Sequence, residues 1–172
     1  MDENYIIKHF PEINDIQNES LRTAVVRVWL LAAQKGGWKT IEDIPFTLLV
    51  KTERTLIDHT RSVTHMAMAI AQQRDDLDMD TIIAGGIVHD VGKLLEYQRK
   101  GGAIVKSEHG QLIRHPISGY ALACEAKLPT AVAHVIAAHS TEGEKVQRSR
   151  EAIVIHHCDF IDFDIVRSKP TT

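Results

Sequence analysis

The stretch Ile82-Ile83-Ala84-Gly85-Gly86-Ile87-Val88-His89-Asp90-Val91-Gly92-Lys93 is the most informative part of this chain. An apolar run without charge ends in an imidazole and a carboxylate, which places two ionisable groups at the inner end of a buried helix. Buried ionisable groups need partners. A divalent cation would satisfy both, because imidazole nitrogen and carboxylate oxygen are good metal ligands. The alternative is a His89–Asp90 hydrogen bond at a helix end.

Two further residues support the metal interpretation. His59 lies on an apolar helical stripe with Leu56 and Val63, where an unpaired imidazole would cost free energy. Asp159 shares a face of the last expected helix with hydrophobic residues. Three helices could therefore bring their ligands together.

The spacing of apolar residues elsewhere is close to 3.6, and period-2 alternation is scarce, so the sequence predicts an all-α fold. Loops are expected at 38–50, with a turn of helix near 47–50, and over the polar run 101–114. Helices are expected at 15 or 18 to 35, 52–74, 81–90, 117–127, 130–139 and 145–166.

Length and composition limit the possible functions. The chain has 172 residues, of which 44% are hydrophobic, enough for one domain with a proper core. With 20 basic and 23 acidic residues, bulk electrostatic binding to nucleic acid or anionic membrane is not expected. The apolar stretches are too short to span a bilayer, Cys124 and Cys158 form no CxxC pair, and no signal peptide is apparent, so we expect a cytoplasmic protein. Ten histidines direct attention to metal or acid–base chemistry.

The order His59, His89-Asp90, Asp159 resembles the HD-domain superfamily of metal-dependent phosphohydrolases, including the Gly-Lys that follows the doublet. The stretches Arg114-His115-Pro116-Ile117-Ser118-Gly119 and Ala137-Ala138-His139-Ser140 are similar to the third and fourth histidines of its two-metal subgroup. The resemblance implies an HD-type helical bundle with an additional N-terminal helix. It divides the chain into an N-terminal helical extension packed on the core (1–51), a metal-binding domain (52–166) and a flexible tail (167–172).

The same resemblance implies two divalent ions, of Fe, Mn, Zn, Co, Ni or Mg. One would be bound by His59, His89, Asp90 and Asp159, the other by Asp90, His115 and His139, with Asp90 bridging. A bridging hydroxide would then attack a small phosphate ester, such as a nucleotide. Asp90 and Lys93 are the expected catalytic residues, Lys93 by neutralising phosphoryl charge, unless it is merely a surface lysine at a helix end.

Other residues receive smaller roles. Arg114, Ser140 and Thr141 are expected to contact the substrate from the rim. His65 is about 240° round the helix from His59 and should face solvent, and His134 should also face elsewhere. His156 or His157 could hydrogen-bond a ligand.

Two features depart from the best-known branches of the family. His139 is followed by Ser140-Thr141-Glu142-Gly143 rather than a Gly-Tyr-Pro element, so cyclic-dinucleotide cleavage is not expected. Thr55 stands where a glutamate could hold a third metal, so a third ion is not expected either.

Two other functions stay open at this point. The same ligand set serves diiron oxygenases that cleave a C–C or C–P bond, and a regulatory module could retain the metals without catalysis. A homodimer is a further expectation, for which Trp29 and Trp38 near the N-terminal helix are a weak indication.

Overall fold

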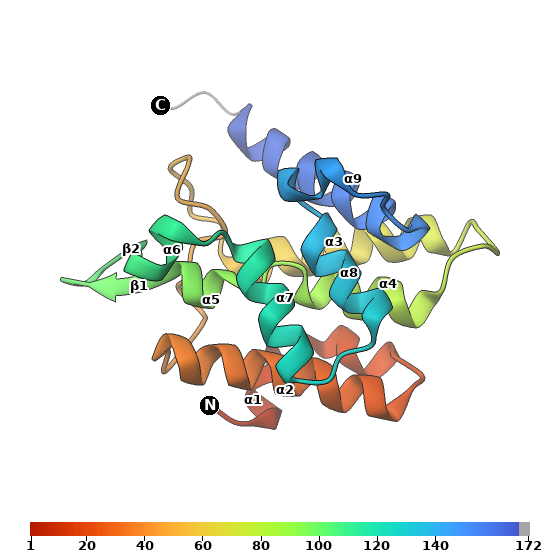
Figure 1. Ribbon diagram of the computed structural model, residues 1–172, viewed down its shortest axis with the longest axis horizontal. Coiled ribbons are helices and arrows are strands. Elements are labelled where there is room, and N and C mark those ends of the chain that lie inside the picture. The colour runs from red at the N-terminus through yellow and green to blue at the C-terminus, as the bar shows by residue number, and fades with distance from the viewer. Residues whose placement is uncertain (169–172) are drawn as a thin grey trace.

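The apolar run before His89 forms helix α4 (Met79–Val88), which lies in the middle of the molecule. The computed structural model describes residues 1–168, and these are mostly helical (Figure 1). Asp78 caps α4 by accepting a hydrogen bond from the Thr81 backbone N–H at 2.7 Å. Gly86 lets α4 approach α3 (Leu56–Ala71) closely, because a Cβ there would lie 2.7 Å from the Thr64 hydroxyl. The sequence therefore places α4 at the centre of an all-α bundle.

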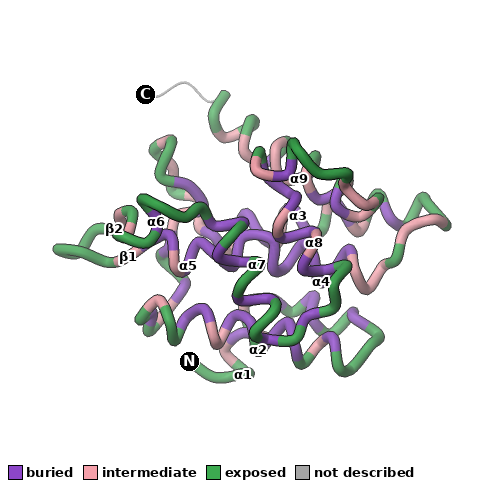
Figure 2. The backbone as a smooth tube through the Cα atoms, in the orientation of Figure 1, coloured by how far each residue is buried: buried purple, intermediate pink, exposed green. Residues whose placement is uncertain are grey.

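The remaining elements surround this helix. In chain order they are α1 (Glu3–His9), the 3-10 helix η1 (Pro11–Asp15), α2 (Glu19–Gly36), α3, α4, α5 (Lys93–Glu96), β1 (Tyr97–Lys100), β2 (Ala103–Lys106), α6 (Glu108–Leu112), α7 (His115–Glu125), α8 (Thr130–Ala138), the 3-10 helix η2 (Thr141–Lys145) and α9 (Arg150–Arg167). In Figure 1, α1 and α2 form the bottom layer, α3, α4 and α8 the middle, and α9 the top. Figure 2 shows the buried residues concentrated in the middle layer and on the side of α2 that faces it.

The N-terminal helices pack on the segment that carries the His-Asp doublet. The side chain of Trp29 in α2 is fully buried, and its indole N–H donates to the Ile87 carbonyl at 3.3 Å. Trp38 donates likewise to the Leu94 carbonyl at 2.7 Å. Both tryptophans thus belong to the chain's own core and provide no argument for a dimer surface.

The structure corrects several expected boundaries. The range 101–114 is not a loop: β1 and β2 form an antiparallel hairpin around Gly101 and Gly102, whose φ angles of 58° and 82° suit a tight hairpin turn, and α6 follows. The turn of helix expected at 47–50 is absent from the described chain. The last helix begins at Arg150 rather than at 145, because Ser149 caps it. The expected tail begins inside α9, and residues 169–172 lie outside the described part.

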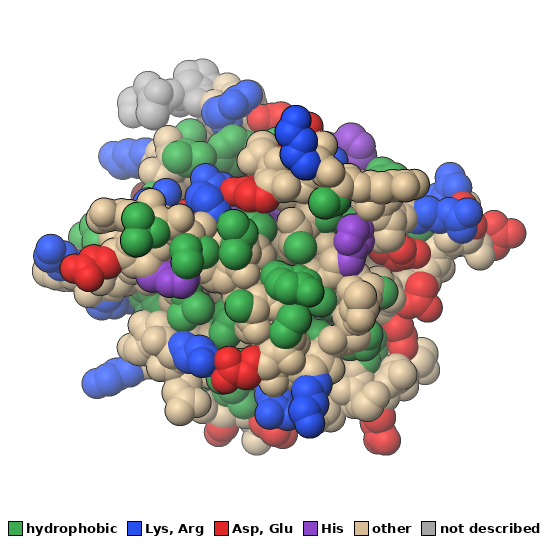
Figure 3. All heavy atoms as spheres, in the orientation of Figure 1, with side chains coloured by type: hydrophobic (Ala, Val, Ile, Leu, Met, Phe, Trp, Pro, Cys, Tyr) green, Lys and Arg blue, Asp and Glu red, His purple; other side chains and the backbone are tan. Residues whose placement is uncertain are grey.

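Exposed hydrophobic side chains gather over α6 and α7, in the middle of the face in Figure 3. They include Leu112, Ile113, Ile117 and Tyr120. Among the described residues, no helix is both long and apolar enough to cross a membrane.

Candidate metal centre

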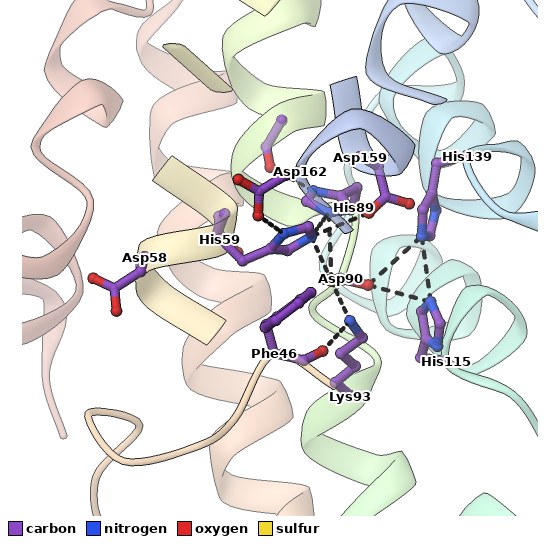
Figure 4. A network of polar contacts seen from close by, with 12 residues as sticks. Phe46, Asp58, His59, His89, Asp90, Lys93, His115, His139, Asp159 and Asp162 are labelled. Atoms are coloured by element: carbon purple, nitrogen blue, oxygen red, sulfur yellow. Dashed lines mark hydrogen bonds and ion pairs between the residues drawn. The ribbon is translucent and has the colours of Figure 1, made fainter. Parts of the chain in front are cut away.

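Asp90 lies at the centre of a cluster of histidines (Figure 4). It follows the end of α4 in a tight turn, and its residue is 1% exposed. Gly92 in the same turn allows the close approach of α7, since a Cβ there would lie 2.0 Å from the His115 carbonyl oxygen. Gly92 thereby allows His115, a candidate ligand at the start of α7, to lie next to Asp90.

The first group of candidate ligands comes from α3, the end of α4 and α9. His59 Nε2 lies 3.3 Å from His89 Nε2 and 3.1 Å from Asp159 Oδ1. Both imidazole Nε2 atoms lie 3.4 Å from Asp90 Oδ2. The three helices thus converge as the sequence predicts.

The second group comes from the first residue of α7 and the residue that ends α8. His115 Nε2 and His139 Nε2 are 3.3 Å apart. They lie 3.2 and 3.6 Å from Asp90 Oδ1. One carboxylate therefore presents one oxygen to each pair of histidines.

In all four histidines Nδ1 forms a hydrogen bond with an oxygen atom, and this bond orients the ring so that Nε2 faces the cluster. His89 Nδ1 donates to the Gly86 carbonyl at 2.7 Å, and His139 Nδ1 donates to the Ile136 carbonyl at 2.8 Å. The Nδ1 atoms of His59 and His115 face carboxylates, as described below. A carbonyl only accepts, so Nδ1 carries a proton and Nε2 is the atom that faces the cluster and is available to a metal.

Two buried lone pairs that face each other at 3.3 Å repel unless a proton or a metal ion lies between them. Two nitrogens bound about 2.1 Å from one tetrahedral ion are about 3.4 Å apart, close to the spacing within each pair. His59, His89 and Asp159 form one group that could hold an ion, and Asp90, His115 and His139 form another. The donor set, imidazole plus carboxylate, therefore fits a divalent metal at both positions.

Two carboxylates that the sequence did not identify as partners of the candidate ligands hold these ligands in place. Asp162 Oδ2 accepts from His59 Nδ1–H at 2.7 Å, and Arg54 binds both oxygens of Asp162 at 3.0 and 2.7 Å. Glu96 Oε2 accepts from His115 Nδ1–H at 2.8 Å and from the His115 backbone N–H at 2.7 Å. Such carboxylate partners fix the tautomer and raise the basicity of a ligand histidine. A signal existed for each, since Asp162 is one turn after Asp159 and Glu96 one turn after Lys93.

Lys93 is buried, so its interpretation as a surface lysine is wrong. Its Nζ donates to Asp90 Oδ2 and to the Phe46 carbonyl, each at 2.5 Å. Burial opposes the charged form, but the charge of Asp90 raises the pKa of Lys93 above its usual value. Burial likewise opposes ionisation of Asp90, and Lys93 is the first of the positive charges that hold the pKa of Asp90 well below its usual range.

The pKa values of His59 and Asp159 show that the first ligand group favours a positive charge among its carboxylates. Burial disfavours an imidazolium at His59, yet hydrogen bonds with Asp159, Asp162 and Asp90 raise its pKa to about 10. The pKa of Asp159 is held at about 2 against the effect of burial, chiefly by its hydrogen bond with His59. A proton here takes the place of a cation among three carboxylates, so metal and proton compete for this position.

A cavity of about 290 Å³ opens onto the cluster. The predicted substrate contacts Arg114, Ser140 and Thr141 all line it, as do Asp90 and Lys93. Arg114 also pairs with Glu142 at 3.3 Å. The rest of the lining includes aromatic and aliphatic residues: Phe46, Leu48, Leu49, Phe160 and Phe163.

The histidines expected outside the cluster do lie outside it. His65 pairs with Glu12 at 2.7 Å, and its side chain is 56% exposed. His134 Nε2 accepts the Ser149 backbone N–H at 3.1 Å. His156 Nδ1 donates to the His139 carbonyl at 2.6 Å, so it supports the backbone of a candidate ligand rather than its ring.

Comparisons with known proteins agree with this arrangement. The HD domain family matches residues 56–164. A dihydroneopterin 2',3'-cyclic phosphate phosphodiesterase of Methanocaldococcus jannaschii is 29% identical over 119 residues, which cover 66% of this chain and 48% of that protein. The chain thus spans about half the length of this relative. No solved structure matches the present chain.

Proposed function

Because the chain belongs to the HD domain family, we propose that it is a metal-dependent phosphohydrolase that cleaves a small phosphate ester, such as a nucleotide, at a centre of two divalent ions. The observation that carries the proposal is the position of Asp90, whose two oxygens face one histidine pair each. A carboxylate between two ligand groups suits a two-metal hydrolase, in which two neighbouring ions act on one phosphoryl group.

Each residue of the cluster has a role in this proposal. His59, His89, Asp90 and Asp159 would hold one ion, and Asp90, His115 and His139 the other. The ions, drawn from Fe, Mn, Zn, Co, Ni or Mg, would lower the pKa of water and polarise a phosphoryl oxygen when bound. Because oxygen acceptors hold the Nδ1 atoms of the four histidines, each ring would bind its ion through Nε2.

Lys93 would act on the reaction through Asp90 as well as through charge. Its ammonium holds Asp90 Oδ2 in place and links it to the backbone at Phe46. Since Lys93 also lines the cavity, its charge would stabilise negative charge that develops on a phosphoryl group. Arg114, Ser140 and Thr141, which also line the cavity, would contact the substrate from the rim.

The cavity supports a small substrate with a flat, apolar part. Its volume of about 290 Å³ suits a small molecule. Phe46, Phe160 and Phe163 line it and would exclude water from the bound ester. The relative named above acts on a cyclic phosphate of dihydroneopterin, so both monoesters and 2',3'-cyclic phosphates belong in a substrate screen.

The proposal is tested with protein reconstituted with Mn²⁺, Fe²⁺ or Zn²⁺ and assayed on nucleoside monophosphates and 2',3'-cyclic nucleotides. We expect cleavage of a phosphate ester, and we expect a chelator to abolish it. The Asp90→Ala variant should lose this activity, whereas the matched control His65→Ala should keep it. Reconstituted protein that cleaves none of these esters but shows a mixed-valent diiron signal would contradict the proposal and favour the oxygenase.

A further inference from the structure

Tyr97 lines the cavity next to the metal cluster, although nothing in the sequence singled it out. It ends α5 as the C-cap residue and begins β1, where it pairs with Lys106 across the hairpin. The residue is 5% exposed and belongs to the hydrophobic core. Its ring is therefore held firmly by the fold.

The hydroxyl of Tyr97 has no hydrogen-bond partner among residues 1–168. By contrast, the indole N–H groups of the buried Trp29 and Trp38 both donate hydrogen bonds to backbone carbonyls. Buried phenols usually find one too, because an unsatisfied polar group costs free energy. The Tyr97 oxygen is not among the sealed, unpaired atoms of the described chain, so it keeps some accessible surface, and the residue lines the cavity.

Two cationic side chains, Lys93 and Arg114, line the same cavity as Tyr97. The charges of Lys93, Asp90, Glu96 and Arg114 all act on it. Burial raises the pKa of the phenol to about 12, so the group is a donor at neutral pH. An unused donor that faces the cavity beside cations and candidate metal ligands is suited to an anionic oxygen.

We propose that the Tyr97 hydroxyl donates a hydrogen bond to the phosphoryl group of the substrate. This assignment rests on the phosphohydrolase function proposed above, and it makes Tyr97 a substrate-binding residue. No proton is transferred: the phenol remains intact and orients one phosphoryl oxygen.

The alternative role for Tyr97 is packing alone, as its place in the core would allow. The two roles separate cleanly in Tyr97→Phe, because the ring is kept and no protein hydrogen bond within the described chain is lost. A hydrogen bond to a charged group contributes about 1.5–3 kcal/mol, which corresponds to about 10- to 100-fold in affinity.

The experiment measures binding of inorganic phosphate to metal-loaded wild type, Tyr97→Phe and the control Tyr120→Phe, whose ring lies on the surface outside the cavity. We expect Tyr97→Phe to raise the dissociation constant at least 10-fold, with unchanged metal content and unchanged unfolding midpoint, while Tyr120→Phe behaves as wild type. On any ester that the enzyme cleaves, kcat/KM should fall to a similar degree.

Equal phosphate affinity in Tyr97→Phe and wild type would overturn the assignment and leave the proposed function standing. A lower unfolding midpoint with unchanged affinity would show a packing role and would overturn it as well. If metal-loaded wild type binds no phosphate at all, the proposed function fails first.

Discussion

Removing the carboxylate of Asp162 should weaken one metal position and leave the other intact. The Nδ1–H of the fully buried His59 donates to this carboxylate at 2.7 Å. In Asp162→Ala the imidazole loses the acceptor that fixes its proton on Nδ1, so a fraction of the rings carry it on Nε2, the atom that faces the cluster. Loss of such a partner costs about 10- to 100-fold in metal affinity, or about 1.4–2.7 kcal/mol.

Glu96 provides the matching perturbation on the other side of Asp90. It holds His115 as Asp162 holds His59, at a similar distance of 2.8 Å. Glu96→Ala should therefore weaken the second position by a similar factor. Asp164→Ala is the control, because Asp164 is an exposed acid on the same helix as Asp162.

The assay is equilibrium titration of chelator-treated protein with Zn²⁺ or Mn²⁺. Wild type should show two binding steps, and each of the two variants should keep one near its original affinity. If Asp162→Ala weakened both steps equally, or neither, the separation into two ligand groups would be refuted.

Three further outcomes follow from the same geometry. Asp90→Ala should bind neither ion tightly while His65→Ala binds both, which elemental analysis checks; an emptied site in the latter would show that the face assignment of α3 is wrong. Gly92→Ala should destabilise the protein by about 1–3 kcal/mol in urea unfolding and lower metal content, because the new Cβ meets the His115 carbonyl at 2.0 Å; unchanged stability would refute the close approach. Although burial favours the neutral acid, hydrogen bonds from His115 hold the pKa of Glu96 at about 2 against the usual 4.5. Because this pKa is depressed in the folded state, Glu96 stabilises the metal-free protein above pH 4.5, and this stabilisation is lost as the pH falls towards 2. Glu96→Gln should flatten that loss, and an identical pH profile would speak against it.

The sequence predicted the helices that carry the candidate ligands and the convergence of those ligands. Its signal was strong because His59, His89 and Asp90 are ionisable residues within apolar stretches, an arrangement that local periodicity makes visible. The family resemblance supplied His115 and His139, whose surroundings alone would not have singled them out.

Other features could not be predicted because they depend on contacts between distant parts of the chain. Asp162 looks like the polar face of an amphipathic helix until α3 is packed against α9, and Lys93 looks like a surface lysine until residue 46 covers it. The hairpin after Glu96 has little alternation in its short strands, so the Gly101-Gly102 pair alone suggested a loop. The sequence did not single out Tyr97 because the cavity that Tyr97 lines is formed in part by this hairpin.

The most direct test of the central claim is metal content per chain in protein purified without chelator, with an EPR spectrum of the same sample. Two divalent metals per chain without a mixed-valent diiron signal are the predicted result. One metal or none would contradict the two-metal centre around Asp90, and two irons with that signal would contradict the phosphohydrolase.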